Sequence, residues 1–498
     1  MKTKTALIRA FFFLTASVLL LVLYGVFLPR VLYGAISVSL EKNEMESAYK
    51  LTDIMIRFFP SHEKTQDLIL SSLPFTDGID AVYKKEIVIT AWGGSTRYPQ
   101  ISAVRKDDAF GQKIVRVAEA QKMEMWKWNI YERYGCYLTS TGSFKDAETV
   151  LIKAEEGFEK LNSFFRARMA YYHLAGNERA RGNKEGAFDY LSIAGSEKFD
   201  ECSNTDGVLA ELGHLYLEKG MLDEAEVCFQ KTIKEIEDSR AEIISWGEEP
   251  FDLEIQSPWL RSRSGLKMIE TLRSKNESVM QKNVSGLITY NGKPLAGVSA
   301  YLMPYDEKYM ALGPGTGSDE NNFQTVSGSD GLLNFYAVPD GTYRLVLGFY
   351  AYQLQDAGKF YYPETVTIKS GEKTEFNIQI YPKFKVITKE IIKPGYEKAM
   401  QFSWEPVENA AEYEVWLFVK TKDITYSHPI ASARDLNYTL LIPDEDSLAS
   451  EFSLNPEDEP ILAATVTIQA VDKYGHILTD SAGLVYDANE DYPIIFLK

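Results

Sequence analysis

The 498-residue chain contains little cysteine and little histidine, and its basic residues are fewer than its acidic ones. Its three cysteines, Cys136, Cys202 and Cys228, are too few for a disulfide framework in a chain of this length. Their spacing matches no zinc motif. Cys136 and Cys228 fall within helical patterns, so we expect both to be small, buried apolar residues, whereas a pairing of Cys202 stays open.

The charge balance disfavours nucleic acid as a partner. Lys and Arg number 53 against 71 Asp and Glu, which gives a formal net charge of −18, and phosphate binding needs clustered basic residues. Broad contact with anionic lipid is disfavoured for the same reason. The alternative role of this charge is to keep the surface soluble. Hydrophobic residues make up 45% of the chain, as is typical of folded protein, and the length predicts two to four domains.

The motifs of common enzymes are also missing. The five histidines are scattered, and no H-E-x-x-H, G-x-S-x-G, P-loop or G-x-G-x-x-G pattern occurs. We therefore predict that the chain is not an enzyme and has no cofactor and no metal site. Two alternatives stay open: paired carboxylates for hydrolysis cannot be detected from sequence, and acidic loops such as Asp444 to Asp446 could bind calcium instead of being solvated.

One long hydrophobic run stands at the N-terminus. Ala10 to Leu28 is 19 residues long and has no charge, and a helix of this length spans roughly 30 Å, about the thickness of a bilayer core. Lys2, Lys4 and Arg9 precede it, so we expect the N-terminus in the cytoplasm and everything after Leu28 outside. A cleaved signal peptide is the alternative, although its apolar region is usually shorter and a small-x-small site should follow.

A helical pattern with an internal repeat follows, from about Leu40 to Lys275. The repeat places two small residues seven apart, an alanine five residues later and a large apolar residue four after that. Its three copies carry Gly135, Gly142, Ala147 and Leu151; Ala175, Gly182, Ala187 and Leu191; and Gly213, Gly220, Ala225 and Phe229. The anchoring alanines are 40 and 38 residues apart, as expected for a period of roughly 34 with short insertions.

This spacing has a physical reason. Two antiparallel helices can approach closely only if Gly135, Ala175 and Gly213 carry no bulky side chain. Gly142, Gly182 and Gly220 are expected in the turns, where a positive φ is tolerated by glycine. One such hairpin cannot bury its faces alone, so we expect the hairpins to stack.

The pattern resembles the tetratricopeptide repeat (TPR), over about Trp128 to Asp238, with a generic helical bundle as the alternative. The second copy departs from it, because Glu178 stands where the third has Tyr216. The resemblance implies a concave groove lined by the first helix of each hairpin, which binds a peptide or a partner helix. The groove-facing candidates that it implies are Asn129, Glu132, Thr139, Tyr172, Arg179, His214 and Glu218. The alternative for each is a solvated helix face.

Near Lys282 the sequence changes to alternating strands and glycine-rich turns. Asn291-Gly292 predicts a tight hairpin, since both residues of that turn need positive φ. This turn, the later Asp330-Gly331 and the segment Pro339 to Tyr343 resemble the carboxypeptidase regulatory-like domain, a transthyretin-related β-sandwich, over about 282–382. The insertion Tyr305 to Asn322 is a departure from that family. The resemblance implies an accessory fold without zinc ligands.

The last segment has the features of a second sandwich. Trp404, Pro406, Ala410 and Tyr413, followed by Val466, Ala470, Val471 and Gly475, resemble a fibronectin type III domain. Such a sandwich needs a buried tryptophan on one strand that packs across two sheets. The acidic stretch Pro443 to Pro460 lengthens a connection that is normally shorter.

The sequence thus predicts a multidomain fold: an N-terminal transmembrane helix, an all-α TPR-like repeat array and two all-β sandwiches. The expected boundaries are 1–36 for the stub and anchor (or signal peptide), 37–275, 282–382 and 383–498. We expect a non-catalytic, membrane-anchored surface protein of bacterial type that binds a protein or peptide partner through the groove. The sandwiches would serve as spacers or adhesion elements.

The alternative function is a cell-envelope protein that binds carbohydrate through its β-sandwiches. Tyr350 and Tyr352, or Tyr361 and Tyr362, could stack on sugars if they are exposed. Their alternative role is to lie in the core or on an edge strand.

Overall fold

The computed structural model describes residues 25, 27–41, 45–72, 87–89, 108–199, 207–251, 253, 257–274, 282–304, 323–354, 357–358, 365–369, 372–384, 386–391, 399–420, 425–441, 463–474, 476–480 and 494–495. The chain folds into two compact units. The first comprises Met1–Lys84, Arg105–Asn177 and Ala187–Ser203, and the second Lys85–Val104, Glu178–Gly186 and Asn204–Lys498.

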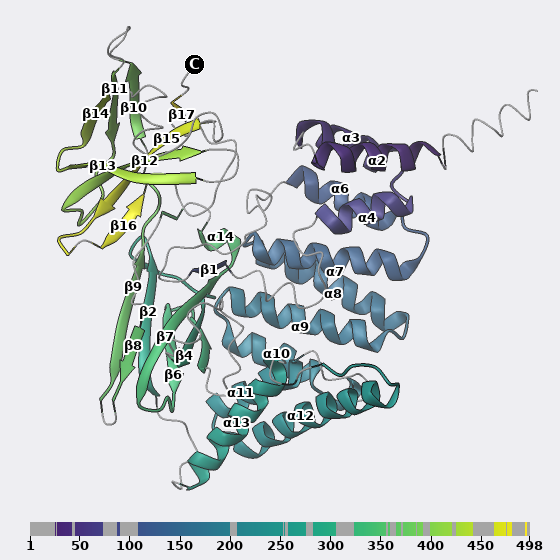
Figure 1. Cartoon of the computed structure of the whole chain (residues 1–498). Coiled ribbons are helices and arrows are strands. Elements are labelled where there is room, and N and C mark those ends of the chain that lie inside the picture. The colour runs from purple at the N-terminus through teal and green to yellow at the C-terminus, as the bar shows by residue number, and fades with distance from the viewer. Residues whose placement is uncertain are drawn as a thin grey trace, which may run out of the picture. The chain divides into compact units, whose positions relative to one another are not determined.

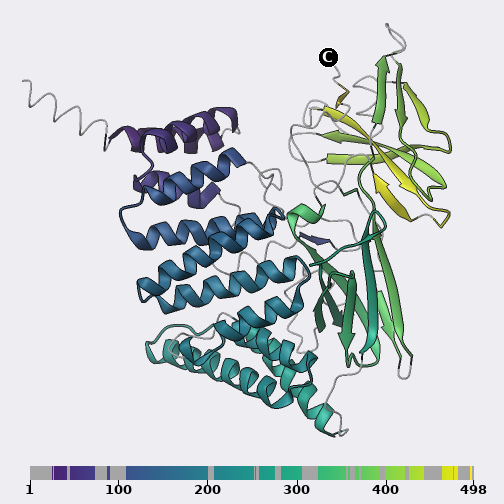
Figure 2. The same ribbon diagram turned by 180° about the vertical axis from the view of Figure 1, so that it is seen from behind.

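The first unit is helical, and neighbouring helices run antiparallel (Figures 1 and 2). Its helices are α2 (Leu28–Glu41), α3 (Met45–Phe58), α4 (Glu63–Ser72), α6 (Asp108–Glu119), α7 (Glu124–Ser140), α8 (Phe144–Lys160), α9 (Phe164–Ala180) and α10 (Lys184–Ala194), followed by the short 3-10 helix η3 (Glu197–Phe199). The end of α9 and the start of α10, with the turn that joins them, belong to the second unit.

The small residues of the repeat lie at the predicted close contacts. A Cβ atom placed on Gly135 of α7 would lie 2.5 Å from Cγ of Leu151 on α8, so no larger residue fits without displacing that side chain. Ala175 and Leu191, on α9 and α10, are both fully buried. The turn glycines adopt the predicted left-handed conformation, with φ of 76° at Gly142, 79° at Gly182 and 75° at Gly220. The predicted hairpins are therefore confirmed.

The longest segment of the second unit, Asn204–Lys498, contains the helices α11 (Val208–Glu218), α12 (Leu222–Ser245) and α13 (Ser257–Ser274). Phe229 on α12 fills the space between its two neighbours. Cβ atoms on Gly213 of α11 or Gly265 of α13 would both collide with its ring. The aromatic side chain of the third repeat thus contacts two helices, each of which has a glycine at the point of contact.

Two sheets packed face to face follow. One joins β1 (Ile87–Ile89), β7 (Gly341–Phe349), β4 (Ser299–Pro304) and β5 (Phe323–Val326), with β8 (Thr365–Ile368) paired to β7. The other joins β3 (Lys293–Pro294), β2 (Lys282–Tyr290) and β6 (Leu332–Tyr336), with β9 (Thr374–Ile380) parallel to β2. Their facing side chains form one core that includes Ile288, Leu333, Leu345 and Leu347. This is a β-sandwich, as predicted.

The turn at Asn291-Gly292 adopts the predicted geometry. Its two residues have φ of 48° and 74°, and the flanking Tyr290 and Lys293 pair across the hairpin. Strand β2 begins at Lys282, where the sequence pattern changes. Strand β1 was not predicted: Ile87–Ile89 lies within the expected helical segment but pairs antiparallel with β7.

The last part of the chain forms a second sandwich. A three-stranded sheet orders β10 (Val386–Ile391), β11 (Ala399–Trp404) and β14 (Asn437–Leu441). The other sheet orders β13 (Thr425–Ala433), β12 (Glu412–Lys420), β15 (Ala463–Val471) and β16 (Ile477–Asp480), with β17 (Ile494–Ile495) paired to β15. A short helix, α14 (Ala351–Leu354), follows β7 in the first sandwich.

The tryptophan predicted to pack across the second sandwich does so. Trp404 on β11 is 1% exposed, and its ring centroid lies 5.4 Å from that of Tyr413 on β12 of the opposite sheet. The Tyr413 hydroxyl accepts a hydrogen bond from the Val407 backbone N–H. Cys136 and Cys228 are free and buried in the helices, as expected.

Some predicted features lie outside the described residues. They are the pairing of Cys202, the insertion Tyr305 to Asn322, the acidic stretch Pro443 to Pro460 and almost all of the predicted span Ala10 to Leu28. Among the residues that are described, no helix is both long and apolar enough to cross a membrane.

Candidate functional site

In the first unit, the predicted groove residue Glu132 belongs to a buried polar cluster between α7 and α9. Glu132 on α7 is 2% exposed. Its Oε2 lies 3.5 Å from a guanidinium nitrogen of Arg166, and its Oε1 lies 3.5 Å from Nε2 of His173. Both partners are on α9. Three ionisable groups therefore meet between α7 and α9, which are the first helices of two consecutive hairpins. These distances are longer than good hydrogen bonds.

Burial dominates the ionisation of this cluster. It raises the pKa of Glu132 to about 7, against the opposing effect of the Arg166 and Arg133 charges. It lowers the pKa of His173 to about 3, with Arg133 and Arg166 acting in the same direction. Near neutral pH the imidazole is therefore uncharged, and Glu132 lies close to its midpoint.

Three buried polar atoms of α7 and α9 have no hydrogen-bond partner among the described residues. They are Oδ1 of Asn129, Oε1 of Glu132 and Nδ1 of His173. Thr139 differs, because its hydroxyl donates to Asn177 Oδ1 at 2.9 Å, and the Asn177 amide donates in turn to the Phe144 carbonyl.

Tyr172, the fourth groove candidate of this unit, is 7% exposed. Of the four candidates in the first unit, Glu132, Thr139 and Tyr172 are buried and Asn129 is partly exposed. These positions do not test partner binding, so the groove assignment stays a prediction.

The other three groove candidates lie in the second unit. Arg179 forms an ion pair with Glu211 of α11. His214 meets the Phe229 ring edge-on at 5.0 Å, and burial lowers its pKa to about 3, assisted by the Arg261 charge. Glu218, at the end of α11, faces a pocket.

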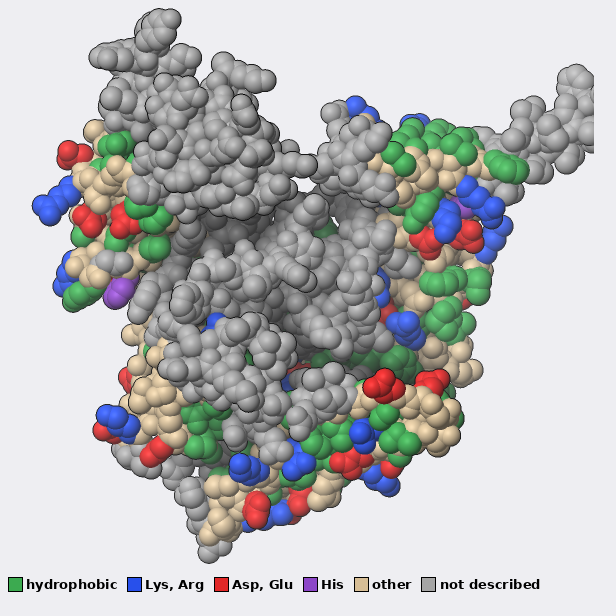
Figure 3. Space-filling model, viewed as in Figure 1, with side chains coloured by type: hydrophobic (Ala, Val, Ile, Leu, Met, Phe, Trp, Pro, Cys, Tyr) green, Lys and Arg blue, Asp and Glu red, His purple; other side chains and the backbone are tan. Residues whose placement is uncertain are grey.

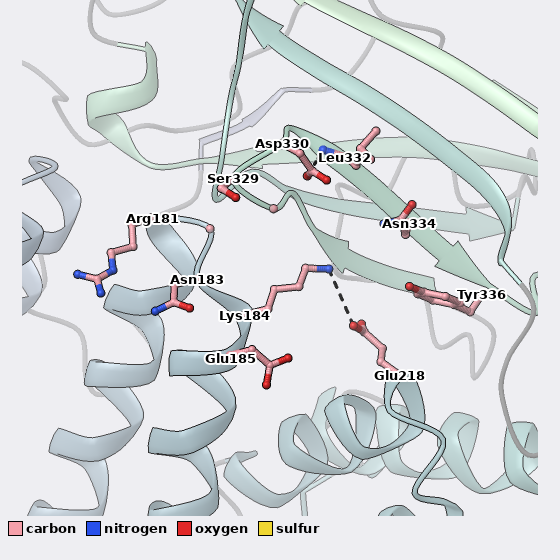
Figure 4. A pocket seen from close by; sticks show the side chains of 12 residues that line it. Arg181, Asn183, Lys184, Glu185, Glu218, Ser329, Asp330, Leu332, Asn334 and Tyr336 are labelled. Carbon is pink, nitrogen blue, oxygen red and sulfur yellow. Dashed lines mark hydrogen bonds and ion pairs between the residues drawn. The ribbon is translucent and has the colours of Figure 1, made fainter.

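This pocket, within the second unit, has a volume of about 650 Å³ (Figure 4). Residues 181–185, from the α9–α10 turn and the start of α10, line it, and α11 contributes Glu218. The turn before β6 contributes 328–330, and β6 itself contributes Leu332, Asn334 and Tyr336. The last three alternate along the strand and so share one face of the sheet.

Close backbone contacts fix the α9–α10 turn against the first sandwich. A Cβ atom on Gly297 would collide with the Ala180 carbonyl oxygen, and one on Gly182 would lie 2.7 Å from the Ser329 nitrogen. The Tyr352 hydroxyl donates a 2.9 Å hydrogen bond to the same Ala180 oxygen. The pocket walls therefore belong to one packed structure.

The chemistry of the pocket is polar and mixed in charge. The Lys184 ammonium lies 3.9 Å from the Glu218 carboxylate, beyond hydrogen-bond distance. Burial raises the pKa of Glu218, with Lys184 and Lys219 opposing the shift. Oδ1 of Asn334 is buried, and no described residue forms a hydrogen bond with it. Burial and the Glu218 charge raise the pKa of the Tyr336 hydroxyl.

Of these lining residues, the sequence predicted only Glu218 as a binding residue, and it marked Gly182 and Asp330 as turn residues. Lys184 and Asn334 are 150 positions apart, so no local pattern links them. The available signals were the charged turn Arg181 to Glu185 and the "SGSDG" turn that ends at Gly331. Neither signal relates the two turns to each other.

The tyrosines considered for sugar stacking are differently placed. Tyr350 is 5% exposed, and its ring stacks on that of Tyr352 at 6.2 Å. Tyr361 and Tyr362 lie outside the described residues. In the part of the chain that the structure describes, no three His, Cys, Asp or Glu side chains gather as metal ligands would.

Comparisons with known proteins leave the family open. No family model and no curated protein matches the chain. Solved structures align with 40–41% of it: DUF3823 family proteins from Parabacteroides merdae and Bacteroides ovatus, each 17% identical, and a protein from Bacteroides uniformis, provisionally named as carbohydrate binding, 14% identical. The alignments cover 96–98% of those chains, with TM-scores of 0.15–0.17. Scores this low carry no argument about fold or function.

Proposed function

We propose that this protein is a non-catalytic binding protein. It is anchored in the cell membrane by Ala10 to Leu28, with its N-terminus in the cytoplasm and its domains outside. Its TPR-like helices bind a protein or peptide partner, and its two sandwiches, similar to carboxypeptidase regulatory-like and fibronectin type III domains, serve as spacers or adhesion elements.

The observation that carries this proposal is the set of polar atoms on the first helices that lack a partner within the described residues. Asn129 Oδ1, Glu132 Oε1 and His173 Nδ1 lie on α7 and α9 of one unit, where the resemblance implies a groove. A buried polar group without a partner costs about 1–3 kcal/mol, so such groups need an explanation. Because each of these atoms is buried in the free chain, a peptide would supply the missing hydrogen bonds by separating α7 from α9 as it binds.

Peptide selection tests this function. The full chain in detergent is screened against a displayed peptide library, and dissociation constants are measured for the selected peptides. We expect Asn129→Ala and His173→Ala each to weaken binding about tenfold, since one lost hydrogen bond is worth about 1–1.5 kcal/mol. Glu156→Ala is the control, because that side chain is exposed on α8 and should leave affinity unchanged.

Each outcome has a distinct meaning. If no peptide is selected, the binding function is wrong. If peptides bind all three variants like the parent protein, the function holds but the assignment to α7 and α9 is wrong. Circular dichroism of each variant excludes unfolding as the cause of weaker binding.

The exposed face of α2 supports the membrane anchor. Helix α2 begins at Leu28, where the uncharged run ends. Phe27, Val31 and Val38 are spaced four and seven apart and therefore lie on one helix face, where they are 47–64% exposed. Ile54 and Phe58 of α3 are also exposed, and hydrophobic side chains gather over this pair of helices (Figure 3). Apolar residues on a helix next to a span favour contact with the bilayer interface.

Carbohydrate binding by the β-sandwiches is the second candidate function. Tyr350 is too buried to stack on a sugar. The pocket between the α9–α10 turn and β6 favours this candidate, because it combines an aromatic ring with amide and carboxylate groups.

A further inference from the structure

We propose that the pocket of the second unit binds an uncharged sugar. This inference deepens the second candidate function and rests on it. The site comprises Lys184, Glu218, Asn334 and Tyr336, which come from the start of α10, the end of α11 and strand β6 (Figure 4).

The pocket has the volume of a small-molecule site. Its volume of about 650 Å³ lies within the range of about 300–1,000 Å³ that ligand pockets occupy. Its walls are held by tight contacts at Gly182 and Gly297, so the site is formed before a ligand arrives. Preformed walls reduce the entropy lost on binding.

The hydrogen-bonding groups of the walls match hydroxyl groups. Asn334 Oδ1 is a buried acceptor that no described donor reaches, and it requires one. Glu218 offers acceptor oxygens and the Lys184 ammonium offers donors. The two groups are 3.9 Å apart, too far for a hydrogen bond with each other, so both can bind a ligand. A sugar hydroxyl both donates and accepts, so a ring with adjacent hydroxyls can serve all three groups.

The charges of the walls favour a neutral ligand. Arg181 is paired with Glu178, and Glu185 is paired with Lys219. Of the remaining groups, Lys184 faces Glu218, and Asp330 is exposed at the rim with Oδ1 bound to the Leu332 N–H. Among the described lining residues there is therefore no uncompensated cation, which a phosphate or carboxylate ligand would require.

Tyr336 supplies the apolar surface that one face of a sugar ring needs. It is partly exposed and packs beside the cluster that contains Leu217 and Ile269. That packing fixes its ring in place. The Leu332 side chain, on the same face of β6, adds to the apolar wall.

An array of neutral and acidic oligosaccharides, probed with the full chain in detergent, tests the inference. We expect neutral glycans to bind, with affinities then measured by calorimetry. Asn334→Ala and Lys184→Met should each weaken binding about tenfold, as the loss of one hydrogen bond predicts. Asn377→Ala is the matched control, since Asn377 is an exposed asparagine of the same sheet that does not line the pocket.

The possible results separate the site from the function. If no glycan binds at millimolar concentration, both this inference and the carbohydrate function are overturned. If a neutral glycan binds the Asn334 and Lys184 variants like the parent, carbohydrate binding holds but this pocket is wrong. Binding of acidic glycans alone overturns the proposed ligand class. Unchanged thermal unfolding of the variants excludes loss of fold as the cause.

Discussion

At the scale of single residues, backbone conformation and close contact act together at Gly297. Its φ of 75° disfavours any other residue, and the Ala180 carbonyl oxygen occupies the space that a side chain would need. Gly292 has nearly the same φ, 74°, but no described atom lies within 4 Å of its Cβ position. A substitution at Gly292 therefore tests the cost of the backbone conformation alone, whereas a substitution at Gly297 also tests the cost of the steric collision.

We expect Gly297→Ala to destabilise the protein more than Gly292→Ala. Both substitutions cost about 1–3 kcal/mol for the left-handed backbone, and the first adds about 1–3 kcal/mol of overpacking. Urea unfolding measures the difference, and hydrogen exchange should show faster opening of residues 181–185 in Gly297→Ala alone. Equal loss of stability in the two variants would mean that Ala180 moves aside freely.

Glu132 and His173 have opposite effects on stability as the pH changes. Glu132 has a folded pKa of about 7, above its ordinary 4.5, so the native state binds the extra proton and the free energy of unfolding falls as pH rises between these values. His173 has a folded pKa of about 3, below its ordinary 6.5, so its contribution rises with pH over that range.

The free energy of unfolding of Glu132→Gln, relative to that of the parent protein, should therefore increase as the pH rises from 4.5 to 7. The gain is expected to reach up to about 3 kcal/mol and then to level off. Unfolding of the helical signal at several pH values measures it. Glu156→Gln, at an exposed site on α8, should show no such trend. A pH-independent difference for Glu132→Gln would refute the raised pKa.

At the scale of elements, the helical hairpins depend on glycines at the points where two helices are in close contact. Gly135 meets Leu151, whereas Gly34 of α2 has no described atom within 4 Å of its Cβ position. The same substitution should consequently have opposite effects in the two helices.

Gly34→Ala is expected to stabilise the protein by about 0.5–1 kcal/mol, because alanine is the better helix former. Gly135→Ala should destabilise it by about 1–3 kcal/mol, since the collision with Leu151 outweighs that gain. Urea midpoints of both variants measure the effects. Stabilisation by Gly135→Ala would mean that α7 and α8 separate without cost.

Local sequence patterns predicted these elements because the residues in each contact are close together in the sequence, so their spacing can be recognised within one short segment. Gly135 and Leu151 are 16 residues apart, and the Asn291-Gly292 turn joins adjacent strands. Strand β1 was not predictable in this way. Its partner β7 lies more than 250 positions further along the chain, and its three residues carry no distinctive pattern.

At the scale of the whole molecule, the proposed anchor fixes which parts of the chain face which compartment. We expect Lys373→Cys, an exposed position in the first sandwich, to react with an impermeant maleimide on intact cells. Thr3→Cys should react only after permeabilisation, since the proposed orientation places the N-terminus, with its positive charges, in the cytoplasm. Cys202→Ser is introduced in both variants to remove the native thiol outside the described residues.

The reverse labelling pattern would contradict the proposed orientation. Labelling of Lys373→Cys combined with loss of the N-terminal segment from the mature protein would favour the cleaved signal peptide instead. Mass spectrometry of the membrane-extracted protein distinguishes that case.

The sequence by itself determined the helical hairpins, the two sandwiches and the residues that pack them, such as Phe229 and Trp404. These features depend on backbone conformation and on contacts between neighbouring segments. Only the tertiary structure brought Lys184, Glu218 and Asn334 to one pocket, and only it buried Glu132 with His173. Such groupings depend on which distant segments pack together. A single sequence does not predict that packing, because no regular spacing links residues that are far apart in the chain.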